Sequence, residues 1–138
     1  MIRNIPFTAV QRALYELLSQ GQSTPVYDSI ITGKEKFPYI YLGAFEGVPA
    51  NENKTVAQHT ITQTIHVWSI KDGKKEVNGI LDDIAYLLTK YTLPLKTYRQ
   101  IGDAHIVQYQ VVGERYESGA NAYQGILLVS YTIEQIND

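Results

Sequence analysis

The chain has 138 residues, of which 44% are hydrophobic and 19% charged, and its formal net charge is −2. These values predict one globular domain with a core of its own, and they exclude a disordered, collagen-like or coiled-coil chain. Because the sequence contains no cysteine, disulfides, thiolate nucleophiles and iron–sulfur clusters are excluded. The slight negative charge predicts no general attraction to nucleic acid or anionic lipid.

The N-terminal residues do not resemble a signal peptide, since Pro6, Thr8, Gln11 and Arg12 interrupt any apolar stretch. No apolar run approaches the ~20 residues that a membrane-spanning helix needs. We therefore expect neither a secretion signal nor a membrane anchor.

The first predicted element is an amphipathic helix over residues 6–20. The apolar residues at helical spacing are Phe7, Val10, Leu14, Leu17 and Leu18. Pro6 suits a first turn, and Gly21 stands where a left-handed C-terminal cap would lie.

Extended chain is predicted next, first as a short piece within residues 24–28 and then as an aromatic-rich strand over residues 37–43. Residues 46–59 follow as a long loop. This segment contains Gly47, Pro49, Asn51 and Lys54, so it is too polar to build a core and too long for a tight hairpin turn.

A strand over residues 60–70 should carry Ile61, Ile65 and Val67 on one face and a row of threonines with His66 and Trp68 on the other. A second amphipathic helix is predicted over residues 74–91, because Val77, Leu81, Ile84 and Leu88 recur at helical spacing. Gly79 within this helix suggests close packing against a sheet.

The C-terminal third predicts a strand over residues 104–112, with Val107, Tyr109 and Val111 on one face. A polar loop over residues 114–122 and a last strand over residues 123–136 follow. The last strand has two apolar faces, which predicts that it is covered on both sides. The order of elements indicates an α+β fold, with two helices packed on one face of a mostly antiparallel β-sheet, in a single domain over residues 1–138.

Catalytic and metal-binding signals are weak throughout the sequence. His59, His66 and His105 have no second ligand at metal-site spacing, and no nucleophile elbow accompanies Asp103 and His105. The neighbouring Asp82 and Asp83 point about 100° apart on a helix and favour a solvated face. We therefore expect no catalytic residue, no cofactor and no metal.

Basic residues gather only at Lys71, Lys74 and Lys75, near Trp68, which favours a solvated turn over a nucleic-acid site. The two polar loops remain as the best functional candidates, and protein contact is the function that such loops favour.

Several phrases resemble a known family, the small tail-completion proteins of long-tailed bacteriophages, also called tail terminators or tail-to-head joining proteins. The phrases are VQRALYELLS, TPVYDSI, KFPYIYLGAFE, QHTITQTIHVWSI, KEVNGILDDIAYLL, YTLPL and GILLVSYTIEQ. The most specific feature is FPYIYLG followed by a strand that ends in IHVWS. The resemblance extends over about residues 9–135.

The resemblance implies a non-catalytic virion protein that forms a ring, usually of six subunits, at the head-proximal end of the tail tube. Such a ring terminates the tail and joins it to the connector of the filled capsid. The implied partners are further copies of the chain, the tail tube protein and the head completion or connector protein, without membrane or specific nucleic acid. The protein would be made in the host cytoplasm and reside in the virion tail.

The candidate assembly-interface residues lie in the two predicted loops, and they are Val48, Asn51, Glu52, Asn53, Lys54, Thr55, Val56, Glu117 and Asn121. The residues by themselves also allow a different class of function, a small ligand- or nucleic-acid-binding regulatory domain. Retention on DNA that weakens steeply with salt would indicate that alternative.

Overall fold

A computed structural model describes residues 4–29, 32, 35–52, 56–70, 73–115 and 121–136. Within these residues the chain forms helices α1 (Phe7–Gly21) and α2 (Lys75–Lys90) and a five-stranded sheet. The strands are β1 (Val26–Tyr27), β2 (Tyr39–Glu52), β3 (Ala57–Ser69), β4 (Tyr98–Arg115) and β5 (Asn121–Gln135). The predicted α+β class and both predicted helices are confirmed.

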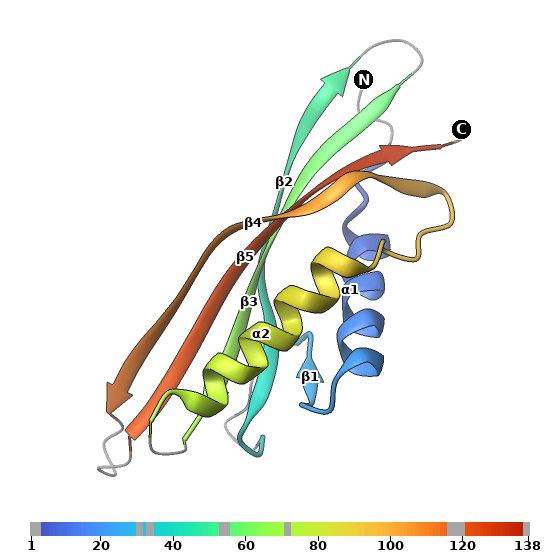
Figure 1. Cartoon of the computed structure of the whole chain (residues 1–138). Coiled ribbons are helices and arrows are strands. Elements are labelled where there is room, and N and C mark those ends of the chain that lie inside the picture. The colour runs from blue at the N-terminus through green and yellow to red at the C-terminus, as the bar shows by residue number, and fades with distance from the viewer. Residues whose placement is uncertain are drawn as a thin grey trace.

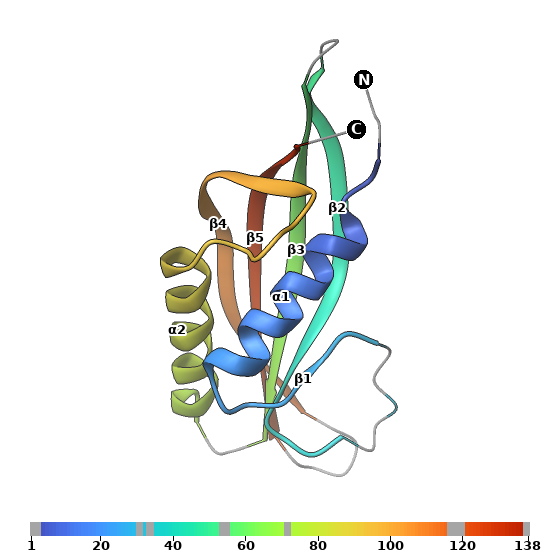
Figure 2. The same cartoon turned by 90° about the vertical axis from the view of Figure 1, so that its right-hand side faces the viewer.

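The sheet has the order β1-β2-β3-β5-β4, and four long strands build its elongated, twisted body (Figures 1 and 2). The short β1 pairs in parallel with β2, and every other pair is antiparallel. The sheet is therefore mostly antiparallel, as the sequence predicts. The last two strands in the chain, β4 and β5, form a hairpin that places β4 at the outer border.

The prediction of a loop over residues 46–59 is wrong for most of this segment. β2 continues to Glu52 and β3 begins at Ala57, with Gly47 opposite Ile61 and Glu52 opposite Ala57. Polar side chains do not prevent strand pairing, because the hydrogen bonds of a hairpin join backbone groups and the side chains can face water. The polarity of this segment indicates exposure rather than irregular structure.

The same error affects β4, for which the sequence predicts only residues 104–112 and which in fact spans Tyr98–Arg115. Of the second predicted loop, residues 116–120 lie outside the described part of the chain. The residues that flank them belong to β4 and β5, where Arg115 pairs with Asn121.

One apolar core joins both helices to alternate residues of the sheet. In β3 every second residue is buried, including Ile61, Ile65 and Val67, and in β5 the buried face includes Leu127 and Val129. The core residues of the helices include Val10, Leu14, Leu18, Val77, Ile84 and Leu88. Leu17 is only partly buried, because it lies at the margin of the α1 stripe.

The sequence predicts that both faces of β5 are covered, but the face opposite the core stays partly exposed. Ile126 and Leu128 lie on this face and stay partly exposed, whereas Leu127 between them is 1% exposed. Apolar residues on both faces of a strand therefore do not require two covering layers, since isolated apolar side chains are common on protein surfaces.

At two glycines of the sheet, an added side chain would meet residues of the helices. A Cβ atom on Gly125 would lie 2.9 Å from both Leu81 Cδ1 and Val77 Cγ2 of α2. A Cβ atom on Gly47 would lie 2.9 Å from Phe7 Cε1 of α1. The helices pack close to the strands at these positions because the glycines have no side chain.

The glycines of the helices have other roles than predicted. Gly79 has open space around it, so it does not mark the contact of α2 with the sheet. Gly21 is the last residue of α1, and its conformation is not left-handed. A Cβ atom there would lie 2.6 Å from Leu87 Cδ2, so this glycine permits close contact between the two helices.

Candidate functional site

The described members of the first group of predicted assembly residues lie on or beside the strands β2 and β3, which extend past the helices at this end of the sheet in Figure 1. Val48 is 60% exposed and pairs with Thr60, while Asn51 and Glu52 are backbone partners of Gln58 and Ala57. Val56 precedes β3 and is partly buried. Asn53, Lys54 and Thr55 lie outside the described residues.

Of the predicted residues of the second loop, the described Asn121 lies at the opposite end of the sheet. Asn121 pairs with Arg115, and Glu117 lies outside the described residues. The register of β3 with β5 pairs Gln58 near the hairpin tip with Glu134, and Ser69 with Tyr123. The two groups of candidate residues are thus separated by the length of the sheet, so they cannot form one common site.

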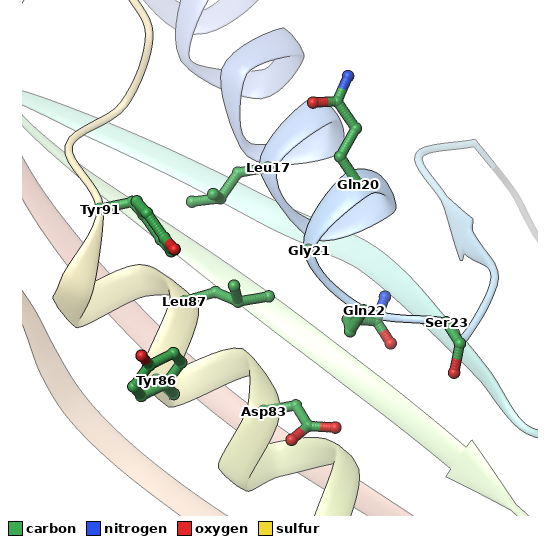
Figure 3. A pocket seen from close by; sticks show the side chains of 9 residues that line it. All are labelled: Leu17, Gln20, Gly21, Gln22, Ser23, Asp83, Tyr86, Leu87 and Tyr91. Carbon is green, nitrogen blue, oxygen red and sulfur yellow. The ribbon is translucent and has the colours of Figure 1, made fainter.

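A groove of about 570 Å³ runs between the C-terminal part of α1 and helix α2 (Figure 3). Leu17, Leu87 and Tyr91 line it together with polar residues that include Gln20 and Asp83. Tyr86, which also lines it, accepts a 2.6 Å hydrogen bond from Lys90 Nζ, and this bond raises the pKa of that lysine. The lining residues offer contact surface but no nucleophile paired with a base.

His66 of β3 contacts a tyrosine and a glutamine of the neighbouring strands. Its ring stacks beside Tyr41 at a centroid distance of 5.9 Å, and its Nδ1 lies 2.9 Å from Gln124 Nε2. Burial lowers the pKa of His66, so the neutral ring accepts a hydrogen bond from the Gln124 amide. His66 is therefore a hydrogen-bonded strand residue.

The other histidines take up separate positions in the sheet. His59 is 4% exposed on the core face of β3, and His105 is exposed on β4. In the described parts of the chain, no group of three or more metal-ligating side chains comes together. Asp82 and Asp83 both face solvent, as predicted.

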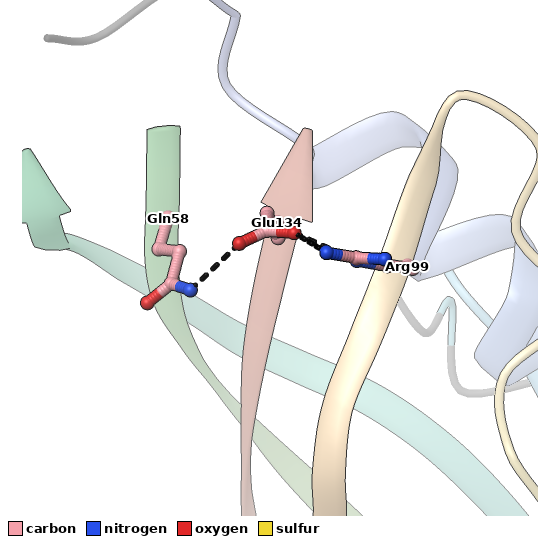
Figure 4. A network of polar contacts seen from close by, with 3 residues as sticks. All are labelled: Gln58, Arg99 and Glu134. Atoms are coloured by element: carbon pink, nitrogen blue, oxygen red, sulfur yellow. Dashed lines mark hydrogen bonds and ion pairs between the residues drawn. The ribbon is translucent and has the colours of Figure 1, made fainter. Parts of the chain in front are cut away.

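A polar network crosses three strands near the hairpin (Figure 4). Gln58 Nε2 of β3 donates a 2.8 Å hydrogen bond to Glu134 Oε1 of β5, and Arg99 Nε of β4 donates a 2.7 Å bond to Glu134 Oε2. These donors, the Gln58 amide first, lower the pKa of Glu134. Because Glu134 is only 8% exposed, these hydrogen bonds stabilise the association of β3, β5 and β4.

The surfaces of the molecule therefore offer contact area at a projecting hairpin and at the borders of the sheet. A comparison with protein-family models matches residues 9–134 to the family described as tail completion protein gp17. The chain belongs to this family. Its resemblance to the tail-completion proteins, inferred from short phrases, is confirmed over nearly the whole chain.

A solved structure supports the fold. A chain of the virion of a native gene transfer agent particle aligns with a TM-score of 0.76 and 19% identity, over 95% of this chain and 99% of that chain. No curated protein matches the sequence. Neither helix in the described part of the chain is long and apolar enough to cross a membrane.

Two features are not evident from the sequence. One is the exposed outer border of β4, where Tyr109 is 73% exposed. The other is a hollow beside β2, lined by residues from α1, β2 and β3. The spacing of Val107, Tyr109 and Val111 predicts a strand face, but only the order of strands shows that β4 is a border strand.

Proposed function

We propose that the protein is a non-catalytic virion assembly protein. In this proposal six copies form a ring at the head-proximal end of the phage tail tube, which terminates the tail and joins it to the capsid connector. The observation that carries the proposal is membership of the tail completion protein gp17 family over residues 9–134. The full-length fold match to a chain of a virion particle supports it.

The partners in this proposal are other copies of the chain, the tail tube protein and the head connector protein, and no cofactor is needed. The protein would be made in the host cytoplasm and reside in the virion. The alternative function as a nucleic-acid binder gains no support from Lys74 and Lys75, which lie exposed at the start of α2 and are followed directly by the acidic Glu76.

The arrangement of layers supports an assembly role. Gly47 contacts α1 and lies opposite Ile61, and Gly125 contacts α2 and lies opposite Val67. Because Ile61 and Val67 are six residues apart on β3, their side chains project from the same face. We infer that both helices pack on this face, which leaves the opposite face, with its threonines, His66 and Trp68, for contact with partners.

The projecting hairpin provides the test. Val48→Glu places a charge on an exposed side chain, so the fold should survive while contact with a partner is lost. We expect capsids filled with DNA and tails that stay unjoined or grow irregularly long, as seen by electron microscopy of particles made with this variant.

Tyr15→Glu is the matched control, because Tyr15 is 38% exposed on α1, which carries none of the candidate assembly residues. Joined particles of normal appearance from the Val48 variant would show that the hairpin is not an assembly element. Equal defects from both variants would argue against a specific role of the hairpin.

A further inference from the structure

The sheet has two borders of different kinds. β4 lies at one border along its whole length, and at the other border β1 pairs only with Ile40 and Tyr41 of β2. From Leu42 to Glu52, β2 therefore has no neighbouring strand on its outer side among the described residues. Border strands with unpaired backbone groups can add a strand from another chain.

The β4 border carries a protruding aromatic side chain. Tyr109 lies opposite Leu127, so both side chains project from the core face of the sheet. Leu127 is 1% exposed, whereas Tyr109 on the border strand is 73% exposed. Val107 beside it is 50% exposed at a register irregularity. This border therefore presents an apolar projection on the core side.

The β2 border carries a hollow of about 700 Å³. Phe7 and Phe45 line it and stack with their centroids 4.6 Å apart, and Gln11 and Asp28 add polar atoms. Phe45 pairs with Gln63, which lies on the core face of β3, so the hollow opens on the same side of the sheet as Tyr109. An aromatic ring fits the apolar part of such a hollow, and its hydroxyl can donate to a carboxylate.

The shape of the hollow is fixed by the strand itself. The register of β2 is irregular between Leu42 and Phe45, which leaves carbonyl groups outside the regular ladder. Gln63 Nε2 donates hydrogen bonds of 3.2 Å to the carbonyl of Gly43 and 3.1 Å to that of Ala44. This buried amide holds the irregular segment in place, so the hollow is preformed.

The directions of the strands allow one copy to continue the sheet of another. Along the order β2-β3-β5-β4 every pair is antiparallel, so β2 and β4 run in opposite directions. A second copy placed with its β2 beside β4 therefore continues the antiparallel pattern. Such a contact joins two different surfaces, which is the head-to-tail arrangement from which rings are built.

We propose that the β4 border of one copy adds to the β2 border of a second copy, with Tyr109 seated in the hollow lined by Phe7 and Phe45. This inference rests on the proposed function and names the contact between neighbouring subunits. A second copy is the occupant because one chain carries both the projection and the hollow, on the same side of the sheet and with matching strand directions. Pro49 and the irregularity beside it end the pairing toward the hairpin tip, since proline has no N–H group to donate.

Cross-linking tests the contact directly, and the absence of cysteine makes the test free of background. The two substitutions are Gln110→Cys on β4 and Glu46→Cys on β2. Gln110 pairs with Ile126 and Glu46 pairs with Thr62, so both cysteines lie on the face opposite the core. With a short bismaleimide linker, a mixture of the two single variants should give linked dimers, and neither variant alone should do so. Linked dimers from the Gln110 variant alone would show that β4 pairs with β4, which overturns the proposal.

Association provides the second measurement. Tyr109→Ala should weaken self-association about tenfold in sedimentation velocity, as expected for a buried tyrosine at an interface. Tyr86→Ala is the matched control, because Tyr86 is 56% exposed on α2 and belongs neither to β4 nor to the hollow, and it should associate like the unmodified protein. Equal association of the Tyr109 variant and the unmodified protein would contradict the proposal, provided that thermal unfolding shows both to be folded.

The two proposals can fail separately. Rings seen by electron microscopy without linkage between the β2 and β4 cysteines would overturn this contact and leave the proposed function intact. Linkage in the protein, together with normal joined particles from phage that lack this gene product, would support the contact and overturn the proposed function. Binding of tail tube protein in the hollow in place of a second copy would also overturn the contact.

Discussion

Glu134 illustrates how a single polar residue can hold strands together near the edge of the core. It receives hydrogen bonds from Gln58 on one side and Arg99 on the other, so three neighbouring strands meet at one carboxylate. The Arg99 side chain is 61% exposed, and solvent therefore screens its charge. The Gln58 bond is the first cause of the lowered pKa of Glu134.

The lowered pKa of Glu134 predicts a loss of stability in acid. A carboxyl group whose pKa is lower in the folded chain stabilises the fold above its unfolded pKa, near 4.5, and this contribution is lost as the pH falls through the lower folded value. Glu134→Gln should cost about 1 kcal/mol at neutral pH and flatten this acid dependence. Urea unfolding at several pH values measures both effects.

Glu16→Gln is the control for this prediction, because Glu16 is exposed on α1. It should leave the free energy of unfolding and its dependence on pH nearly unchanged. An acid dependence that is as steep in the Glu134 variant as in the unmodified protein would mean that other carboxyl groups govern it.

At the scale of elements, α2 is held against the sheet by a contact that depends on a missing side chain. Val77 and Leu81 approach Gly125 closely, and any Cβ there would overlap them. On the outer side of the same helix, Gly79 faces open space. Gly125 therefore permits the contact between α2 and the sheet, whereas Gly79, which the sequence suggests as the contact, does not take part in it.

Paired alanine substitutions test this difference. Gly125→Ala should destabilise the protein by about 1–3 kcal/mol, because the new methyl group forces the helix away from β5. Gly79→Ala should stabilise it by up to about 1 kcal/mol, because alanine favours the helix and meets nothing. Thermal unfolding of both variants decides the matter, and a stabilised Gly125 variant would show that α2 does not pack here as described.

The whole molecule is an elongated sheet whose ends differ in their support. The helices and the core cover its middle, whereas the tip of the hairpin extends beyond them (Figure 1). Val48, Pro49 and Ala50 are all exposed there, so few apolar contacts hold this part of β2. Regions with few buried contacts open at low free energy, and they gain the most from contact with a partner.

Hydrogen exchange should therefore distinguish the two parts of β2. In the free protein, amides near Val48 should exchange about tenfold faster than those near Ile40, which is fully buried, since local opening of the exposed end does not require the core to unfold. In assembled tails this difference should shrink, because contact with neighbours covers the hairpin. Equal, slow exchange along all of β2 in the free protein would show that the hairpin is as stable as the core.

The sequence alone determined the parts of this protein that depend on local chemistry. Helical spacing of Val77, Ile84 and Leu88 predicts α2, and alternation from Ile61 to Val67 predicts the core face of β3. The tail-completion family is likewise indicated by contiguous phrases of the sequence, such as FPYIYLG and IHVWS. The signals for helix and strand are local because the period of apolar residues follows directly from backbone geometry.

The tertiary structure decided what depends on distant pairing. Only the register shows that residues 46–52 and 57–59 belong to paired strands, because backbone hydrogen bonds leave no mark in polar side chains. Only the order of strands shows that Tyr109 projects at a border and that the hollow by Phe45 lies at the other border. A strand has the same alternation in the centre of a sheet as at its edge, so its neighbours, and with them the candidate contact between copies, are fixed by the folded chain as a whole.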